Sequence, residues 1–145
     1  MSAVATETDQ VYAVFVRATP EQVWDAITKA DFTEQYFFGA RIDIKDGRRF
    51  TQIGEMEWDE EVLEAEAPSR LVHRFVAAYD PDMGAEEPSR VTWEIEPQDG
   101  GITKLTVVHD QLEGAPKTAE SVAGGWMYIL SGLKTLLETG KPLAG

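Results

Sequence analysis

The chain of 145 residues has no cysteine and only two histidines, His73 and His109. Without cysteine it has no disulfide, no thiolate ligand and no cysteine nucleophile, and its composition suits a reducing cytoplasm. A zinc site needs about three or four histidine, cysteine or carboxylate ligands, so histidine ligands are in short supply. The sequence also lacks G-x-S-x-G and Walker-type phosphate motifs. We therefore expect no catalytic residues, no metal, no cofactor and a cytoplasmic location.

Basic residues are scarce as well, with 13 Lys and Arg against 26 Asp and Glu, for a net charge of −13. Proteins bind nucleic acids and anionic membranes through clustered Lys and Arg, so we expect neither as a partner. No apolar run reaches the ~20 residues of a membrane-spanning helix. The length suggests one domain, which we expect over residues 10–140. Residues 1–9 would form a flexible N-terminal tail and residues 141–145 a C-terminal tail.

The pattern of apolar residues predicts the order of the elements. A β-branched and aromatic stretch at residues 11–18 predicts a strand, and Thr19 with Gln22 forms a capping box that starts a short helix. A second short helix ends at Gly39. From there to residue 110, apolar and polar residues alternate between turn signals, which predicts about six strands of an antiparallel sheet with a solvated acidic row on one strand.

The stretch "SVAGGWMYILSGLKTLLETGK" at residues 121–141 predicts a long terminal helix, with its apolar positions on one arc of about 120°. It contains three glycines, although each costs a helix about 1 kcal/mol relative to alanine. Gly125 and Gly132 stack on one flank of the apolar arc, whereas Gly124 lies on the far side. We interpret this flank as a notch that admits either close packing or a ligand.

Together with this order, the stretches "RATPEQVWDAIT", "FTEQYFFG" and "GGWMYILSGLKTLLETG" resemble the START-like helix-grip superfamily (SRPBCC). Within it they are similar to the activator of heat-shock protein 90 ATPase homologue group, the Aha-type C-terminal domain. The resemblance implies an α+β, birch-pollen-allergen-like fold over residues 10–140. In that fold two short helices follow strand one, and a long C-terminal helix crosses a curved antiparallel sheet of about seven strands, with a cavity between them.

Large side chains on the segments that face this cavity are our candidates for ligand binding. Either they fill an ordinary core or they surround an apolar pocket. The candidate lining residues are Phe38, Phe50, Trp58, His73, Phe75, Trp93, His109, Trp126, Ile129 and Leu130.

The two histidines are interpreted as buried polar residues, one of which could anchor a ligand. Guessed hairpin registers place Trp93 opposite Leu105 and separate the histidines by two strands and about four residues, or roughly 16 Å, too far to share a metal. His109 is the better anchor, because Asp110 could hold its tautomer. Glu60 or Glu64 could also point inward and act as an acid or an anchor.

We therefore expect a non-enzymatic protein that binds a small apolar or amphipathic ligand. One alternative is a chaperone-associated, ATPase-activator-like interaction module with a role in the stress response, whose partner is a chaperone or another protein. A second alternative is a cyclase or hydrolase that uses the same pocket. The sequence is compatible with a monomer or a homodimer and leaves the ligand open.

Overall fold

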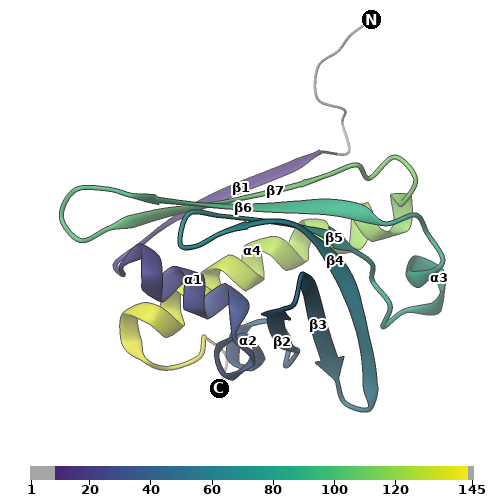
Figure 1. Ribbon diagram of the computed structural model, residues 1–145, viewed down its shortest axis with the longest axis horizontal. Helices are drawn as coiled ribbons and strands as arrows, with labels where there is room; N and C mark the ends of the chain where they lie inside the picture. Colours follow the sequence, from purple (N-terminus) through teal and green to yellow (C-terminus); the bar gives the residue numbers. More distant parts are fainter. Residues whose placement is uncertain (1–8, 144–145) are drawn as a thin grey trace, which may run out of the picture.

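The computed structural model describes residues 9–143, and its elements follow the predicted order, with one additional short helix between the fifth and sixth strands (Figure 1). The first strand, β1 (Gln10–Val16), leads into α1 (Pro20–Thr28) and α2 (Ala30–Tyr36). The remaining elements are β2 (Arg41–Lys45), β3 (Arg48–Ile53), β4 (Met56–Glu66), β5 (Arg70–Phe75), α3 (Pro81–Gly84), β6 (Ser89–Pro97), β7 (Thr103–Asp110) and α4 (Pro116–Thr139). Most of the two predicted tails, at residues 1–8 and 144–145, lies outside the described residues.

The seven strands form one antiparallel sheet in the order β1-β7-β6-β5-β4-β3-β2. Figure 1 shows α4 running across one face of this curved sheet, with α1 and α2 beside it. Inward side chains of the strands, such as Val91, Trp93 and Leu105, pack in one core with Trp126 and Leu133 of α4. The α+β helix-grip architecture predicted from the sequence is therefore confirmed.

The two main helices are capped in different ways. At α1, Thr19 Oγ1 accepts the backbone N–H of Gln22 and Gln22 Oε1 accepts that of Thr19, so the predicted capping box is present. Helix α4 starts at Pro116, five residues before the predicted start, and its N-cap residue Ala115 has no side-chain oxygen. The carboxylate of Glu86 supplies the cap instead.

Glu86 lies in the loop between α3 and β6 and reaches the first turn of α4. Its carboxylate oxygens accept the backbone N–H groups of Lys117 and Thr118, each at 2.9 Å, and the Thr118 hydroxyl at 2.7 Å. Burial opposes ionisation of Glu86, but these hydrogen bonds and the nearby Lys117 charge lower its pKa. The loop is thereby fixed to the helix that covers the sheet.

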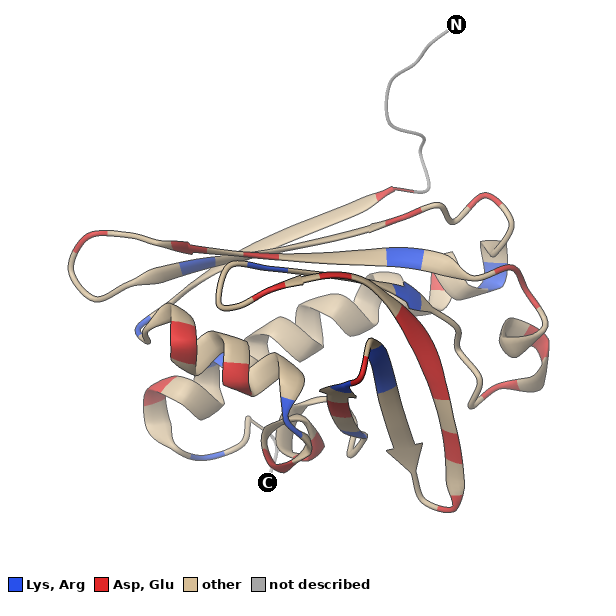
Figure 2. Cartoon of the chain, viewed as in Figure 1, with Lys and Arg blue, Asp and Glu red and all other residues tan. Residues whose placement is uncertain are grey.

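Acidic side chains mark β4 along much of its length, as Figure 2 shows. Glu57, Asp59 and Glu61 are exposed, as the alternating pattern predicted. Among the helices of residues 9–143, none combines the length and apolar character needed to cross a membrane.

Candidate functional site

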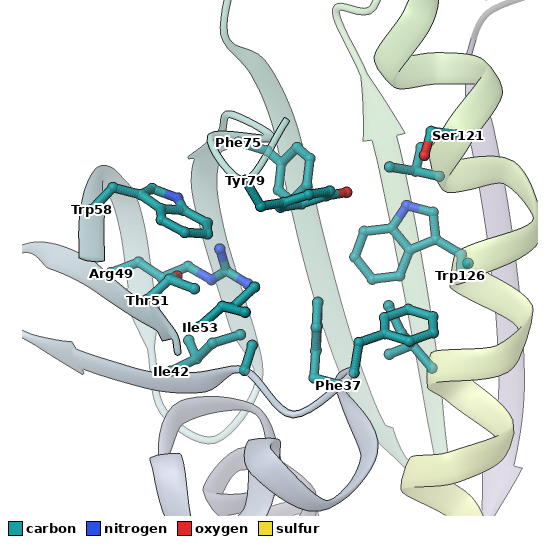
Figure 3. Close-up of a pocket in the computed structure, with 15 residues that line it drawn as sticks. Phe37, Ile42, Arg49, Thr51, Ile53, Trp58, Phe75, Tyr79, Ser121 and Trp126 are labelled. Carbon is teal, nitrogen blue, oxygen red and sulfur yellow. The ribbon is translucent and has the colours of Figure 1, made fainter. Parts of the chain in front are cut away.

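A cavity of about 420 Å³ lies between the inner face of β2 to β5 and helix α4 (Figure 3). Most of its wall is apolar and aromatic. The lining residues are Phe37, Phe38, Ala40, Ile42, Arg49, Thr51, Ile53, Trp58, Phe75, Tyr79, Ser121, Val122, Gly125, Trp126 and Ile129. Tyr79, just before α3, and the turn after α2 bring side chains from outside the sheet to the same space.

Five of the ten candidate residues border this cavity, namely Phe38, Trp58, Phe75, Trp126 and Ile129. Phe38 is 60% exposed and stacks on Tyr128 with 5.4 Å between ring centroids. Its φ of 52° is a left-handed conformation that a bulky residue rarely adopts, so the backbone is strained there. Phe38 therefore lies at the rim of the cavity with a strained backbone conformation.

Phe50 lies on the opposite face of the sheet from the cavity. Its side chain is 37% exposed, and the ammonium of Lys45 lies 5.4 Å from its ring centroid. Successive residues of a strand point to opposite faces, so the inward positions of β3 belong to Arg49 and Thr51. Phe50 was expected among the lining residues because, as a large apolar residue of "RRFTQI", it was assigned to the inner face of the sheet.

His73 and Trp93 lie in the core and are not part of the cavity wall. The indole N–H of Trp93 donates to His73 Nε2 at 3.0 Å, and the other ring nitrogen of His73 lies 2.8 Å from the carbonyl oxygen of Arg74. Burial and, secondly, the charge of Arg49 lower the pKa of His73 well below its usual value. The imidazole is therefore neutral, with Nδ1 as its donor.

His109 makes a second buried pair, with Trp126. The indole N–H of Trp126 donates to His109 Nδ1 at 3.0 Å, so His109 Nε2 carries the proton and donates to Ser89 Oγ at 2.7 Å. Burial lowers the pKa of His109 to about 4, although the charge of Asp110 acts in the opposite direction. His109 therefore lies behind Trp126, and the candidate Leu130 is buried in the core of α4 and the sheet.

The guessed registers that separated the histidines were wrong. Trp93 pairs with Val107 and not with Leu105, and both histidines pair directly with Val91 from opposite sides. They are thus two strands apart in one row, about 10 Å at the usual strand spacing rather than 16 Å. Across residues 9–143, no group of three or more metal-binding side chains comes together.

Arg49 and Glu60 form a buried ion pair at the cavity. Glu60 was expected as an inward carboxylate, whereas burial of Arg49 was not predicted from the sequence. Their side chains are 4% and 2% exposed, and Arg49 Nη1 lies 3.0 Å from Glu60 Oε1. The other carboxylate oxygen accepts the backbone N–H of Val76 at 2.9 Å. Arg49 also lies over the ring of Phe37, with 5.7 Å to the centroid. Of the two predicted inward carboxylates, Glu60 is buried, whereas Glu64 is half-buried and pairs with Arg70.

Two buried polar atoms of the lining residues have no hydrogen-bond partner among the described residues: Thr51 Oγ1 and Trp58 Nε1. The two residues are direct partners across β3 and β4 and belong to the same wall as Arg49. Buried groups of this kind are nearly always satisfied in proteins, either by other protein groups or by ordered water.

The two glycines of the predicted notch have different neighbours. A Cβ at Gly125 would meet only the ring of Phe38, at 3.8 Å, so this position opens onto the cavity. A Cβ at Gly132 would lie 3.0 Å from Tyr36 Cβ and 3.5 Å from Tyr36 O, so this position admits the end of α2. Gly124 faces open space. The notch is thus filled by Tyr36 of α2 at Gly132 and borders the cavity at Gly125.

Comparison with known proteins places this geometry in a family context. A family model described as Activator of Hsp90 ATPase homolog 1-like protein matches residues 17–138. A search of curated proteins found no significant match.

Solved structures share the fold at low sequence identity. A conserved protein of unknown function from Enterococcus faecalis is 16% identical with a TM-score of 0.74, covering 94% of this chain and 75% of that one. The Aha1 dimer from Colwellia psychrerythraea is 17% identical with a TM-score of 0.71, covering 92% and 98%. CalU16 from Micromonospora echinospora is 20% identical with a TM-score of 0.70, covering 94% and 77%.

Proposed function

The chain belongs to the Activator of Hsp90 ATPase homolog 1-like protein family, and we propose that it is a ligand-binding protein. Its fold leaves a cavity beside the long helix α4. The cavity would hold a small apolar or amphipathic molecule between β2 to β5 and α4. The observation that carries this proposal is the lined cavity of about 420 Å³. Small-molecule sites are typically clefts of about 300–1,000 Å³ with mostly hydrophobic walls and a few polar groups.

Binding is favoured over turnover by the state of the two histidines. The cyclase or hydrolase alternative relies on a histidine that is paired with a carboxylate or a tyrosine inside the pocket. His73 and His109 are instead hydrogen-bonded through both ring nitrogens and lie outside the lining. The chaperone-associated alternative rests on the family description, whereas ligand binding has a specific cavity to support it.

The proposal can be tested with two adjacent glycines of α4. Gly125→Leu would place a side chain into the cavity, whereas Gly124→Leu places the same side chain on the open face of the same helix. We expect Gly125→Leu to weaken the binding of small aromatic ligands at least about tenfold, because it removes the space they occupy. Gly124→Leu should bind as the wild type does. Isothermal titration calorimetry provides the affinities.

Native mass spectrometry of the protein purified from its own host gives an independent readout. The wild type and Gly124→Leu should carry a small co-purified molecule, and Gly125→Leu should carry less of it. Equal binding by all three proteins in both experiments would show that the cavity is not the binding site.

A further inference from the structure

The cavity has a polar end on β3 and β4, and its charges are already balanced. Of the described residues that line the cavity, Arg49 alone carries a full charge, and Figure 3 shows its side chain extending from β3 toward the interior. Glu60, which is not itself a lining residue, neutralises Arg49 with its Oε1 at 3.0 Å from Arg49 Nη1 and also accepts the Val76 backbone N–H. An anionic ligand at this place would bring a second negative charge next to the Glu60 carboxylate.

Thr51 and Trp58 add hydrogen-bonding capacity beside Arg49. Direct partners on one face of an antiparallel pair have Cβ atoms about 4.5–5.5 Å apart, so these two side chains lie side by side in the wall. The indole N–H can only donate, and the threonine hydroxyl can donate or accept. Neither Thr51 Oγ1 nor Trp58 Nε1 has a partner in the described chain. The complementary ligand group is therefore an acceptor, such as a carbonyl oxygen.

We propose that the ligand is an uncharged, aromatic or otherwise apolar molecule that carries a hydrogen-bond-accepting oxygen. This inference rests on the proposed ligand-binding function. This oxygen binds at the Arg49, Thr51 and Trp58 end of the cavity. The apolar part of the ligand extends toward Phe75 and Trp126, where the wall is aromatic. A neutral oxygen satisfies the donors without adding a buried charge, whereas a carboxylate leaves the site with an uncompensated negative charge.

The volume of the cavity indicates which probes to use. About 420 Å³ corresponds to roughly 14 water volumes of about 30 Å³, which suits a molecule of about a dozen heavy atoms. Three naphthalenes of similar size differ only in their polar group: 2-acetylnaphthalene has a neutral acceptor, 2-ethylnaphthalene has none, and 2-naphthoate is anionic at pH 7. Calorimetric titration of the wild type with each gives two affinity ratios.

We expect the acetyl compound to bind at least about tenfold more tightly than naphthoate, because naphthoate adds a charge beside Glu60. The ratio of acetyl to ethyl affinity should fall about tenfold when the polar end is removed in the double variant Arg49→Met/Glu60→Gln. Removing both partners leaves no unpaired buried charge, and the glutamine carbonyl can still accept the Val76 N–H.

Thr51→Val and Trp58→Phe provide a second route that does not touch the ion pair. Each should reduce acetyl affinity by about threefold to tenfold and leave ethyl affinity unchanged, since each removes one donor from the site. The melting temperature of Thr51→Val without ligand should equal or exceed that of the wild type, because this change keeps the shape of the side chain and removes an unpaired buried polar atom. A merely structural role for the Thr51 hydroxyl predicts a lower melting temperature instead.

The outcomes separate this inference from the function on which it rests. If naphthoate binds as tightly as the acetyl compound, or if the polar variants keep the wild-type ratio of acetyl to ethyl affinity, the inference is wrong while ligand binding stands. If none of the three probes binds and no ligand co-purifies, the proposed function itself is wrong.

Discussion

At the scale of single residues, the neutral state of two imidazoles holds two indoles in place. Trp93 and Trp126 contact each other edge to face at 5.4 Å, and each donates its N–H to one histidine. An indole can satisfy its N–H only with an acceptor, and a protonated imidazole has none left. Protonation of either histidine would therefore cost a buried hydrogen bond as well as burying a charge.

This arrangement makes stability depend on pH. The pKa of His109 is about 4 in the folded protein against an ordinary 6.5, and that of His73 is also lowered, in both cases mainly by burial. Between these values the unfolded chain binds more protons, so the stabilisation is complete above about pH 6.5 and is lost as the pH falls toward 4. We expect His109 to account for about 2 kcal/mol of lost unfolding free energy between pH 7 and pH 5.

Urea unfolding of the wild type and of His109→Gln at both pH values measures this loss. Glutamine can accept from Trp126 and donate to Ser89 without titrating, so the variant should lose about 2 kcal/mol less than the wild type. His73→Gln removes the other lowered pKa and should likewise reduce the loss of unfolding free energy. Parallel decline of the wild type and His109→Gln would show that His109 does not titrate as described.

At the scale of the elements, the glycines of α4 divide the helix between packing and the cavity. Gly132 lets α4 approach the end of α2, where Tyr36 cannot easily move away because its hydroxyl donates to the Ala26 carbonyl at 2.6 Å. Glycine at this position lowers the helix propensity of α4 but allows the close contact with α2. Gly124 has no such contact and gives up propensity without packing gain in the described structure.

Alanine at these two positions should have opposite effects. Gly132→Ala should lower the free energy of unfolding by about 1 kcal/mol, because the strain of an added methyl against Tyr36 exceeds the gain in helix propensity. Gly124→Ala should raise it by up to about 1 kcal/mol, since the added methyl meets open space. Chemical denaturation of both variants measures the difference, and a stabilised Gly132→Ala would disprove the packing argument.

At the scale of the whole molecule, the excess of negative charge opposes folding. With 26 acidic and 13 basic residues, the compact state concentrates like charges, and β4 carries the exposed Glu57 and Glu61 on one face. Raising the ionic strength shortens the Debye length from about 30 Å at 0.01 M to about 8 Å at 0.15 M and screens this repulsion. Surface ion pairs such as Arg48 with Asp59 are weakened as well, but each contributes little.

We expect the melting temperature to rise by about 2–5 °C between 10 mM and 200 mM sodium chloride, because repulsion outweighs the surface pairs. Differential scanning calorimetry measures the rise. A Glu57→Lys/Glu61→Lys variant, with less excess charge, should show a smaller one. A melting temperature that falls with salt would mean that the ion pairs dominate.

Local chemistry explains how much of the molecule was predictable from its sequence. Strand alternation and the Thr19 capping box depend on neighbouring residues, so the order of elements and the acidic row of β4 were predicted correctly. The cap of α4 was missed because Glu86 lies thirty residues away from the helix start that it serves. The inner wall of β3 was misassigned because its inward residues are the polar Arg49 and Thr51, and only tertiary pairing with Glu60 makes burial of the arginine tolerable.

The pairing of β1 with β7 has a consequence for biosynthesis. Gln10 pairs with His109, so about a hundred further residues must be synthesised before the partner strand of β1 is complete. At translation rates of about 5–20 residues per second this interval lasts roughly 5–20 seconds. The hairpins from β2 to β6 can form as they leave the ribosome, whereas the apolar residues of β1 stay uncovered on the nascent chain. Of the described strands, β1 is thus the earliest to be synthesised and among the last to be incorporated.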